Sequence, residues 1–129
     1  MILFFDRSIG TAIPRALREY LKPPGIGVEY HQQHFDLAER DDVWLPQVGA
    51  WNWFVIGQDY SYHERPTELH ALRTYNIGAF YLWGAQEPKW ETLRSFAKAY
   101  DRIIRAAEVT VKPFVYSVDR RGSLREVYF

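Results

Sequence analysis

Two apolar runs in this sequence are each followed by an aspartate, and two carboxylates placed in this way could form one acidic site. Residues 2–5 run directly into Asp6, and residues 53–56 lead through Gly57 and Gln58 to Asp59. If both runs are parallel strands of one sheet, their carboxylates stand at its carboxyl edge, where open α/β sheets place their ligands. The spacing therefore predicts a shared acidic site at that edge.

A third acid is expected from the start of a helix. Asp41 and Asp42 precede an apolar stretch that contains Trp44, Leu45 and Val48. Acids in a first turn also complement the helix N-terminus, so one of the two aspartates is interpreted as a cap and the other as a site residue. The sequence leaves open which is which.

Three carboxylates can hold a hard divalent cation such as Mg²⁺ or Mn²⁺, with positions left for a scissile phosphate and an attacking water. Asp6, Asp42 and Asp59 are predicted to be catalytic, and Asp6, Asp41, Asp42 and Asp59 are the candidate metal ligands. Crowded carboxylates repel, so the metal-free protein is expected to have raised carboxyl pKa values and to gain stability from metal.

Other chemistries have less support. The chain has no Cys, no Gly-x-Ser-x-Gly and no phosphate-binding glycine motif, and Ser8 and Ser61 have no evident partner base. His31, His34 and Asp36 could bind zinc, but a hydrogen-bonding polar loop is favoured over residues 31–36.

The composition indicates one globular domain over residues 1–129, with 47% hydrophobic residues and 17% aromatic residues that mostly fill a core. The formal net charge of zero argues against general coating of nucleic acid, so any such role needs a local basic patch. No signal peptide or membrane span is evident, and a soluble cytoplasmic protein is expected.

The first half of the chain predicts alternating strands and helices. Strands are expected at 1–5 and 26–30, separated by a helix that Pro23, Pro24 and Gly25 end. The inward side chains of that helix are expected at Ile13, Ala16, Leu17, Tyr20 and Leu21. A second helix follows Asp41 and Asp42.

The second half continues the alternation. A strand leads to Asp59, a helix begins near Thr67 with Leu69, Leu72 and Tyr75 inward, and a strand covers 79–83. The longest helix spans 88–109, with a buried stripe of Trp90, Leu93, Phe96, Ala97, Tyr100, Ile103, Ile104 and Ala107. A hairpin over 114–129 ends the chain. The order favours an α/β fold with a mostly parallel sheet and helices on both faces.

A basic ridge runs beside that stripe. Arg94, Lys98, Arg102 and Arg105 recur along the long helix. A solvated helix face is the favoured interpretation, and a contact with a phosphate backbone is the functional alternative.

At these residues the chain resembles PIN-like domains, of the group typified by the VapC45 toxins of toxin–antitoxin systems. The resemblance rests on Phe4-Phe5-Asp6-Arg7-Ser8-Ile9-Gly10, on Asp41-Asp42-Val43-Trp44-Leu45-Pro46, on Trp53-Phe54-Val55-Ile56-Gly57-Gln58-Asp59 and on the closing hairpin near 113–129. It implies a three-layer α/β/α sandwich with a C-terminal β-hairpin, and metal-dependent RNA cleavage by an acidic cluster. Asp6, Asp59 and either Asp41 or Asp42 would be the ligands.

The chain also departs from the family pattern. Gln58 stands where a basic residue is common, and Tyr60-Ser61-Tyr62 replaces the basic residues that usually follow. Arg7, Arg65, Arg94 and Lys98 then remain as RNA-binding candidates. Glu64 is the candidate for a fourth acid.

Two functions follow from these observations. The first is a Mg²⁺- or Mn²⁺-dependent ribonuclease, the toxin of a pair, with RNA as substrate, a cognate antitoxin as partner and a homodimer as a possible assembly. The second is a catalytically inactive PIN-like module that binds a protein partner through its aromatic surface and hairpin.

Overall fold

The computed structural model describes residues 1–58 and 66–127. Six strands form one sheet in the order β2-β1-β3-β4-β5-β6. They are β1 (Ile2–Phe5), β2 (Gly27–Tyr30), β3 (Phe54–Gly57), β4 (Gly78–Leu82), β5 (Phe114–Val118) and β6 (Leu124–Glu126). Neighbouring strands are parallel except β5 and β6, which pair antiparallel as the closing hairpin. The mostly parallel sheet and its C-terminal hairpin confirm the fold expected from the sequence.

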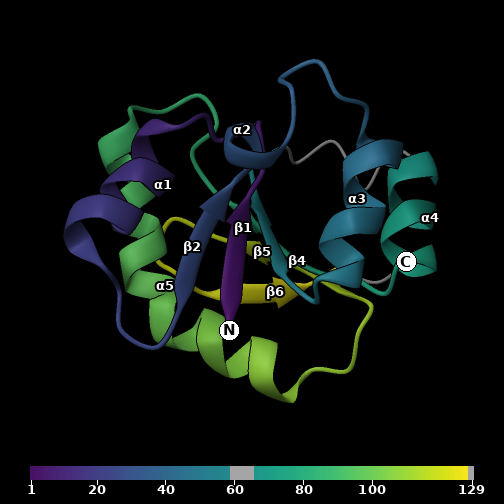
Figure 1. Ribbon diagram of the computed structural model, residues 1–129. Helices are drawn as coiled ribbons and strands as arrows, with labels where there is room; N and C mark the ends of the chain where they lie inside the picture. Colours follow the sequence, from purple (N-terminus) through teal and green to yellow (C-terminus); the bar gives the residue numbers. More distant parts are fainter. Residues whose placement is uncertain (59–65, 128–129) are drawn as a thin grey trace.

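Helices cover both faces of this sheet (Figure 1). On one face lie α1 (Ala12–Ala16), the π-helical segment η1 (Leu17–Leu21) and α5 (Lys89–Val109). The other face carries α3 (Asp41–Ala50) and α4 (Pro66–Thr74), with the short α2 (His31–His34) beside them. The result is a three-layer α/β/α arrangement.

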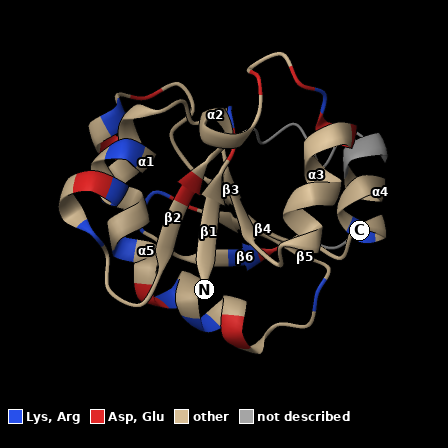
Figure 2. Cartoon of the chain, viewed as in Figure 1, with Lys and Arg blue, Asp and Glu red and all other residues tan. Residues whose placement is uncertain are grey.

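The strands at the centre of the sheet are buried on both faces because their side chains alternate between the two helical layers. Phe4 and Val55 pack with Trp44 and Val48 of α3, whereas Phe5 packs on Phe96 of α5. The strands β1, β3, β4 and β5 carry no charged residue, whereas the two edge strands do: Glu29 lies in β2, and Arg125 and Glu126 lie in β6 (Figure 2). None of the helices in the described ranges is both long enough and apolar enough to traverse a bilayer.

The first helix differs from its predicted register. Ile13 and Leu17 are buried as expected, but Tyr20 is 79% exposed and Leu21 is 59% exposed. The cause is the π-helical winding of η1, because the spacing of 3.6 residues per turn no longer predicts which side chains face inward. The segment η1 ends at Lys22, whose φ of 45° lies in the left-handed region, and Pro23 and Pro24 follow it.

The long helix α5 is rotated relative to the predicted stripe. Phe96, Ile103 and Ala107 are buried as expected, whereas Trp90 and Ala97 are exposed. Leu93, Tyr100 and Ile104 are only half-buried, and the buried face is completed by Thr92, Ser95 and Ala99. The face of α5 that packs on the sheet therefore includes small and polar residues, which a prediction from hydrophobic spacing does not place in the core.

Two smaller expectations were wrong. Residues 31–34 form the short helix α2 instead of a loop, and Tyr75 is 37% exposed instead of facing inward. Tyr75 lies beyond the last residue of α4, so the helical spacing that placed it inward no longer applies there. By contrast, Trp44, Leu45 and Val48 of α3 are buried as predicted.

Candidate active site at the carboxyl edge of the sheet

Asp6 stands directly after β1, at the carboxyl edge of the sheet. Its backbone N–H donates to the Ile56 carbonyl at 2.9 Å, which continues the pairing of β1 with β3. Its side chain is only 8% exposed. The oxygen Oδ1 accepts hydrogen bonds from the backbone N–H of Ser8 at 2.9 Å and from the Ser8 hydroxyl. The sequence prediction that an acid emerges at this edge is thus met at Asp6.

Burial controls the protonation of this carboxyl group. The pKa of Asp6 is raised from 3.8 to about 6, chiefly because burial disfavours the charged form. The Ser8 hydrogen bonds lower the pKa, and the charge of Asp41 raises it by a smaller amount. The sequence argument attributed raised pKa values to repulsion between carboxylates, but desolvation is the larger cause at Asp6.

Ser8 and Gln58 connect the turn after β1 to the end of β3. The backbone N–H of Gln58 donates to the Ser8 hydroxyl oxygen at 3.0 Å. The Gln58 side chain is buried, and its amide donates to the Thr92 hydroxyl at 2.8 Å. These bonds hold the last described residue before Asp59 next to the turn that carries Asp6.

Gly57 allows the Asp6 carboxylate to lie against the backbone of β3. A Cβ atom at Gly57 would stand 2.6 Å from Asp6 Oδ2 and 2.7 Å from a ring carbon of Tyr81. Such distances are well inside van der Waals contact, so any larger residue would displace the carboxylate or the ring. The glycine is therefore part of the site as well as the end of a strand.

Asp41 lies at the first turn of α3, where it is held by two donors. Arg7 Nη2 donates to Asp41 Oδ1 at 2.8 Å, and the indole N–H of Trp44 donates to the same oxygen at 2.9 Å. The other Arg7 nitrogen, Nη1, donates to the carbonyls of Leu37 (3.1 Å) and Glu39. Asp41 is close enough to act on the pKa of Asp6, so the structure brings these two acids to the same edge.

Asp42 points to a different environment. Its Oδ2 pairs with Arg40 at 2.9 Å, and its side chain is 58% exposed. Asp41 is therefore the acid of this pair that lies with Asp6, while Asp42 has the surroundings of a surface residue at a helix start.

The remaining predicted site residues are divided between two regions. Asp59, Glu64 and Arg65 lie outside the described residues. Arg94 and Lys98 are on α5, where both line an apolar groove, and Arg94 lies 4.0 Å from Glu91. Within residues 1–58 and 66–127, no group of three His, Cys, Asp or Glu side chains is arranged to hold a metal ion.

The polar segment that could have bound zinc has another role. His31 is fully buried, and neither ring nitrogen has a hydrogen-bond partner among the described residues. Its ring packs 5.5 Å from those of Phe35 and Trp44, and burial lowers its pKa. His31 is therefore a neutral core residue beneath α3, not part of a hydrogen-bonding loop.

Three residues of the site were not identified from the sequence. The sequence shows no partner base for Ser8, marks Gln58 only as a departure from the family pattern, and gives no signal at Thr92. A hydroxyl two residues after an aspartate is a recognisable local signal, because such side chains commonly close turns onto the preceding carboxylate. The contact of Gln58 with Thr92 joins residues 34 positions apart, and no local pattern predicts it.

A parallel sheet between two helical layers, with acids at its carboxyl edge, defines an α/β protein of the class that binds ligands at that edge. The family described as "PIN like domain" matches residues 1–84, well over half of the chain. This chain therefore belongs to the PIN-like domain family, which includes nucleases. No curated protein and no solved structure matches it.

Proposed function

We propose that this PIN-like domain is a Mg²⁺- or Mn²⁺-dependent endoribonuclease that acts as the toxin of a toxin–antitoxin pair. The observation that carries the proposal is the buried Asp6 carboxylate, with a pKa of about 6, at the same sheet edge as Asp41. A carboxylate kept in an apolar setting costs stability, which is typical of functional sites.

The donor set suits a hard cation. Asp6 and Asp41 offer carboxylate oxygens, which Mg²⁺ and Mn²⁺ prefer. Asp6 Oδ2 is the oxygen that faces Gly57, and no described residue donates to it. Asp59 would complete the set, with Asp42 as the alternative to Asp41. A bound metal would supply polarisation of the phosphoryl oxygen and a lowered pKa for a bound water.

The residues of the chain contribute positioning. The two Ser8 donors fix Oδ1 of Asp6, so the other oxygen is presented in one direction. Gln58 ties the start of the segment that carries Asp59 to Ser8 and Thr92. Arg7 holds the Asp41 carboxylate at the first turn of α3 through a hydrogen bond from its guanidinium group. Arg7 and Arg65 are the candidates for binding RNA beside the acids, whereas Arg94 and Lys98 line a groove on α5 that Asp6 does not share.

A cleavage assay tests this proposal. Labelled single-stranded RNA is incubated with the protein and Mn²⁺, and Asp6→Asn, Asp41→Asn, Asp42→Asn and Asp59→Asn are compared. We expect losses of roughly a hundredfold or more at Asp6, Asp41 and Asp59. The exposed Asp101→Asn on α5 is the matched control. Unchanged cleavage by both Asp6→Asn and Asp59→Asn would refute this site.

A second function is favoured by the pairing of Arg7 with Asp41, which already neutralises one acid of the site. A PIN-like module without catalysis would then act by binding a protein partner, such as an antitoxin. It predicts that neither Mg²⁺ nor Mn²⁺ raises the melting temperature, whereas the nuclease predicts stabilisation that Asp6→Asn abolishes.

A further inference from the structure

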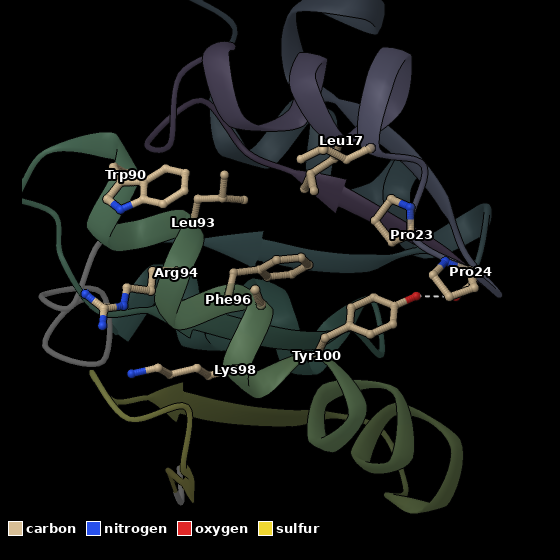
Figure 3. A pocket seen from close by; sticks show the side chains of 11 residues that line it. Leu17, Pro23, Pro24, Trp90, Leu93, Arg94, Phe96, Lys98 and Tyr100 are labelled. Atoms are coloured by element: carbon tan, nitrogen blue, oxygen red, sulfur yellow. Dashed lines mark hydrogen bonds between the residues drawn. The ribbon is translucent and has the colours of Figure 1, made fainter.

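An apolar groove of about 690 Å³ lies between η1 and α5, on the helical layer opposite α3 (Figures 1 and 3). One wall comes from η1 and the residues after it, and the other comes from the first half of α5. The side chains that shape the two walls are Leu17, Leu21, Pro23, Trp90, Leu93 and Tyr100.

The groove leaves large apolar side chains in solvent. Leu21 is 59% exposed and Trp90 is 69% exposed, although both were expected to be buried from their spacing. The apolar face of α5 is therefore wider than the part that the sheet covers, and the excess faces the groove. Contiguous exposed apolar surface of this kind marks interaction sites.

The shape of the groove is fixed by the fold. The Tyr100 hydroxyl donates to the Pro24 carbonyl and so joins α5 to the segment after η1 (Figure 3). Lys22 ends η1 in the left-handed region, and two prolines follow it. A groove with such stiff walls loses little entropy when it is filled.

The charges at the groove select the chemistry of its occupant. Arg94 and Lys98 project from α5 along the rim that lies away from Pro23 and Pro24 (Figure 3). No carboxylate is among the described residues that line it. An occupant therefore needs an apolar face with acidic residues along one side.

The lining favours a protein helix over RNA. Leucine and proline side chains form most of one wall, and they offer neither a stacking ring nor a hydrogen-bond donor to a base. A groove parallel to a helix instead fits apolar residues at i, i+3, i+4 and i+7 of a second helix.

We propose that this groove is the docking site for an acidic amphipathic helix of a protein partner. Leucine-like side chains of that helix fill the space between Leu21 and Trp90, and its carboxylates meet Arg94 and Lys98. Asp6 does not line the groove, so the inference does not depend on nuclease activity.

A designed peptide tests the inference with the full chain. The probe is a fluorescein-labelled peptide of about 18 residues, roughly 27 Å as a helix, with leucines at i, i+3, i+4 and i+7 and flanking glutamates. A second peptide carries lysines in place of the glutamates. Binding is followed by fluorescence anisotropy, and circular dichroism checks that each variant is folded.

We expect saturable binding of the glutamate peptide and at least tenfold weaker binding of the lysine peptide. Leu21→Asp should weaken binding about tenfold or more, because it places a charge in the groove. Lys98→Glu should weaken it several-fold and reduce its dependence on salt. Arg105→Glu, on the same helix but outside the groove, is the matched control and should bind as the wild type does.

Three kinds of result would overturn the proposal. The first is failure of the peptide test, which means no saturable binding of the glutamate peptide, equal binding of both peptides, or binding that Leu21→Asp leaves unchanged. The second is displacement of the peptide by single-stranded RNA, which would make the groove an RNA surface. The third is a dimer in sedimentation that Leu21→Asp dissociates, which would make the occupant a second copy of this chain.

Discussion

At the scale of single residues, the Asp6 carboxylate opposes folding at neutral pH. Its pKa is raised from 3.8 to about 6 in the folded state, so the fold prefers the protonated form. The stability that protonation contributes is fully present below pH 3.8 and is lost as pH rises through about 6. Above that range the buried charge costs about 3 kcal/mol, because one pKa unit corresponds to about 1.4 kcal/mol.

Asp6→Asn should therefore stabilise the metal-free protein, and more so at high pH. Asparagine keeps an oxygen for the two Ser8 donors but carries no charge. We expect the difference in free energy of unfolding between variant and wild type to grow by about 2.5 kcal/mol between pH 4 and pH 8. Urea titrations at several pH values measure it, with the exposed Asp101→Asn as control. A difference that stays constant with pH would contradict the assigned burial.

At the scale of elements, Arg7 joins the turn after β1 to the start of α3. Its guanidinium group contacts the carbonyls of Leu37 and Glu39 and the carboxylate of Asp41, which lie 30 to 34 positions further along the chain. Such a fork of charge-assisted bonds positions a connection that has little other packing. Arg7 is thus first a structural residue, whatever its role towards RNA.

Replacing Arg7 by Lys or Ala should loosen residues 37–42. Lysine keeps the charge but lacks the planar fork, so it cannot serve all three acceptors. We expect both variants to lose about 2 kcal/mol of stability and to exchange backbone amide hydrogens faster in this segment. Hydrogen exchange with mass spectrometry measures the second effect. Arg105→Ala, at an exposed position, is the control. If Arg7→Lys leaves amide exchange in residues 37–42 as slow as in the wild type, the positive charge alone is enough to hold this segment.

At the scale of the whole molecule, the family match ends at residue 84, but the fold does not. The strand β4 pairs with β5 from Gly78 to Leu82, and α5 covers the face of the sheet that carries Phe80. Without those elements β4 would be a long apolar edge, which is prone to aggregation.

A fragment of residues 1–84 should therefore fail to fold. We expect no cooperative thermal transition by circular dichroism and strong binding of a hydrophobic dye. A fragment of residues 1–118, which keeps α5 and β5, should still unfold cooperatively, since it keeps both helical layers and loses only the edge strand β6 with the segments on either side of it. Cooperative unfolding of the shorter fragment would show that the rest of the chain is an addition to an independent core.

Much of this fold could be predicted from local patterns. The buried strands at residues 2–5 and 54–57 are continuous apolar runs, and the anchors of α3 fall at helical spacing. Prediction failed where packing changes the local geometry. The π-helical winding of η1 exposes Leu21, and the rotation of α5 exposes Trp90.

The sequence by itself determined the order of the strands and of every helix except α2, and the presence of an acid directly after β1, because these follow from neighbouring residues. Only the tertiary structure decided that Asp41 and not Asp42 lies with Asp6, and that Gly57 makes room for the carboxylate. Those facts depend on segments tens of residues apart meeting at one edge. The physical reason is that proximity in space is set by packing of the whole sheet, whereas propensity is set by the nearest neighbours along the chain.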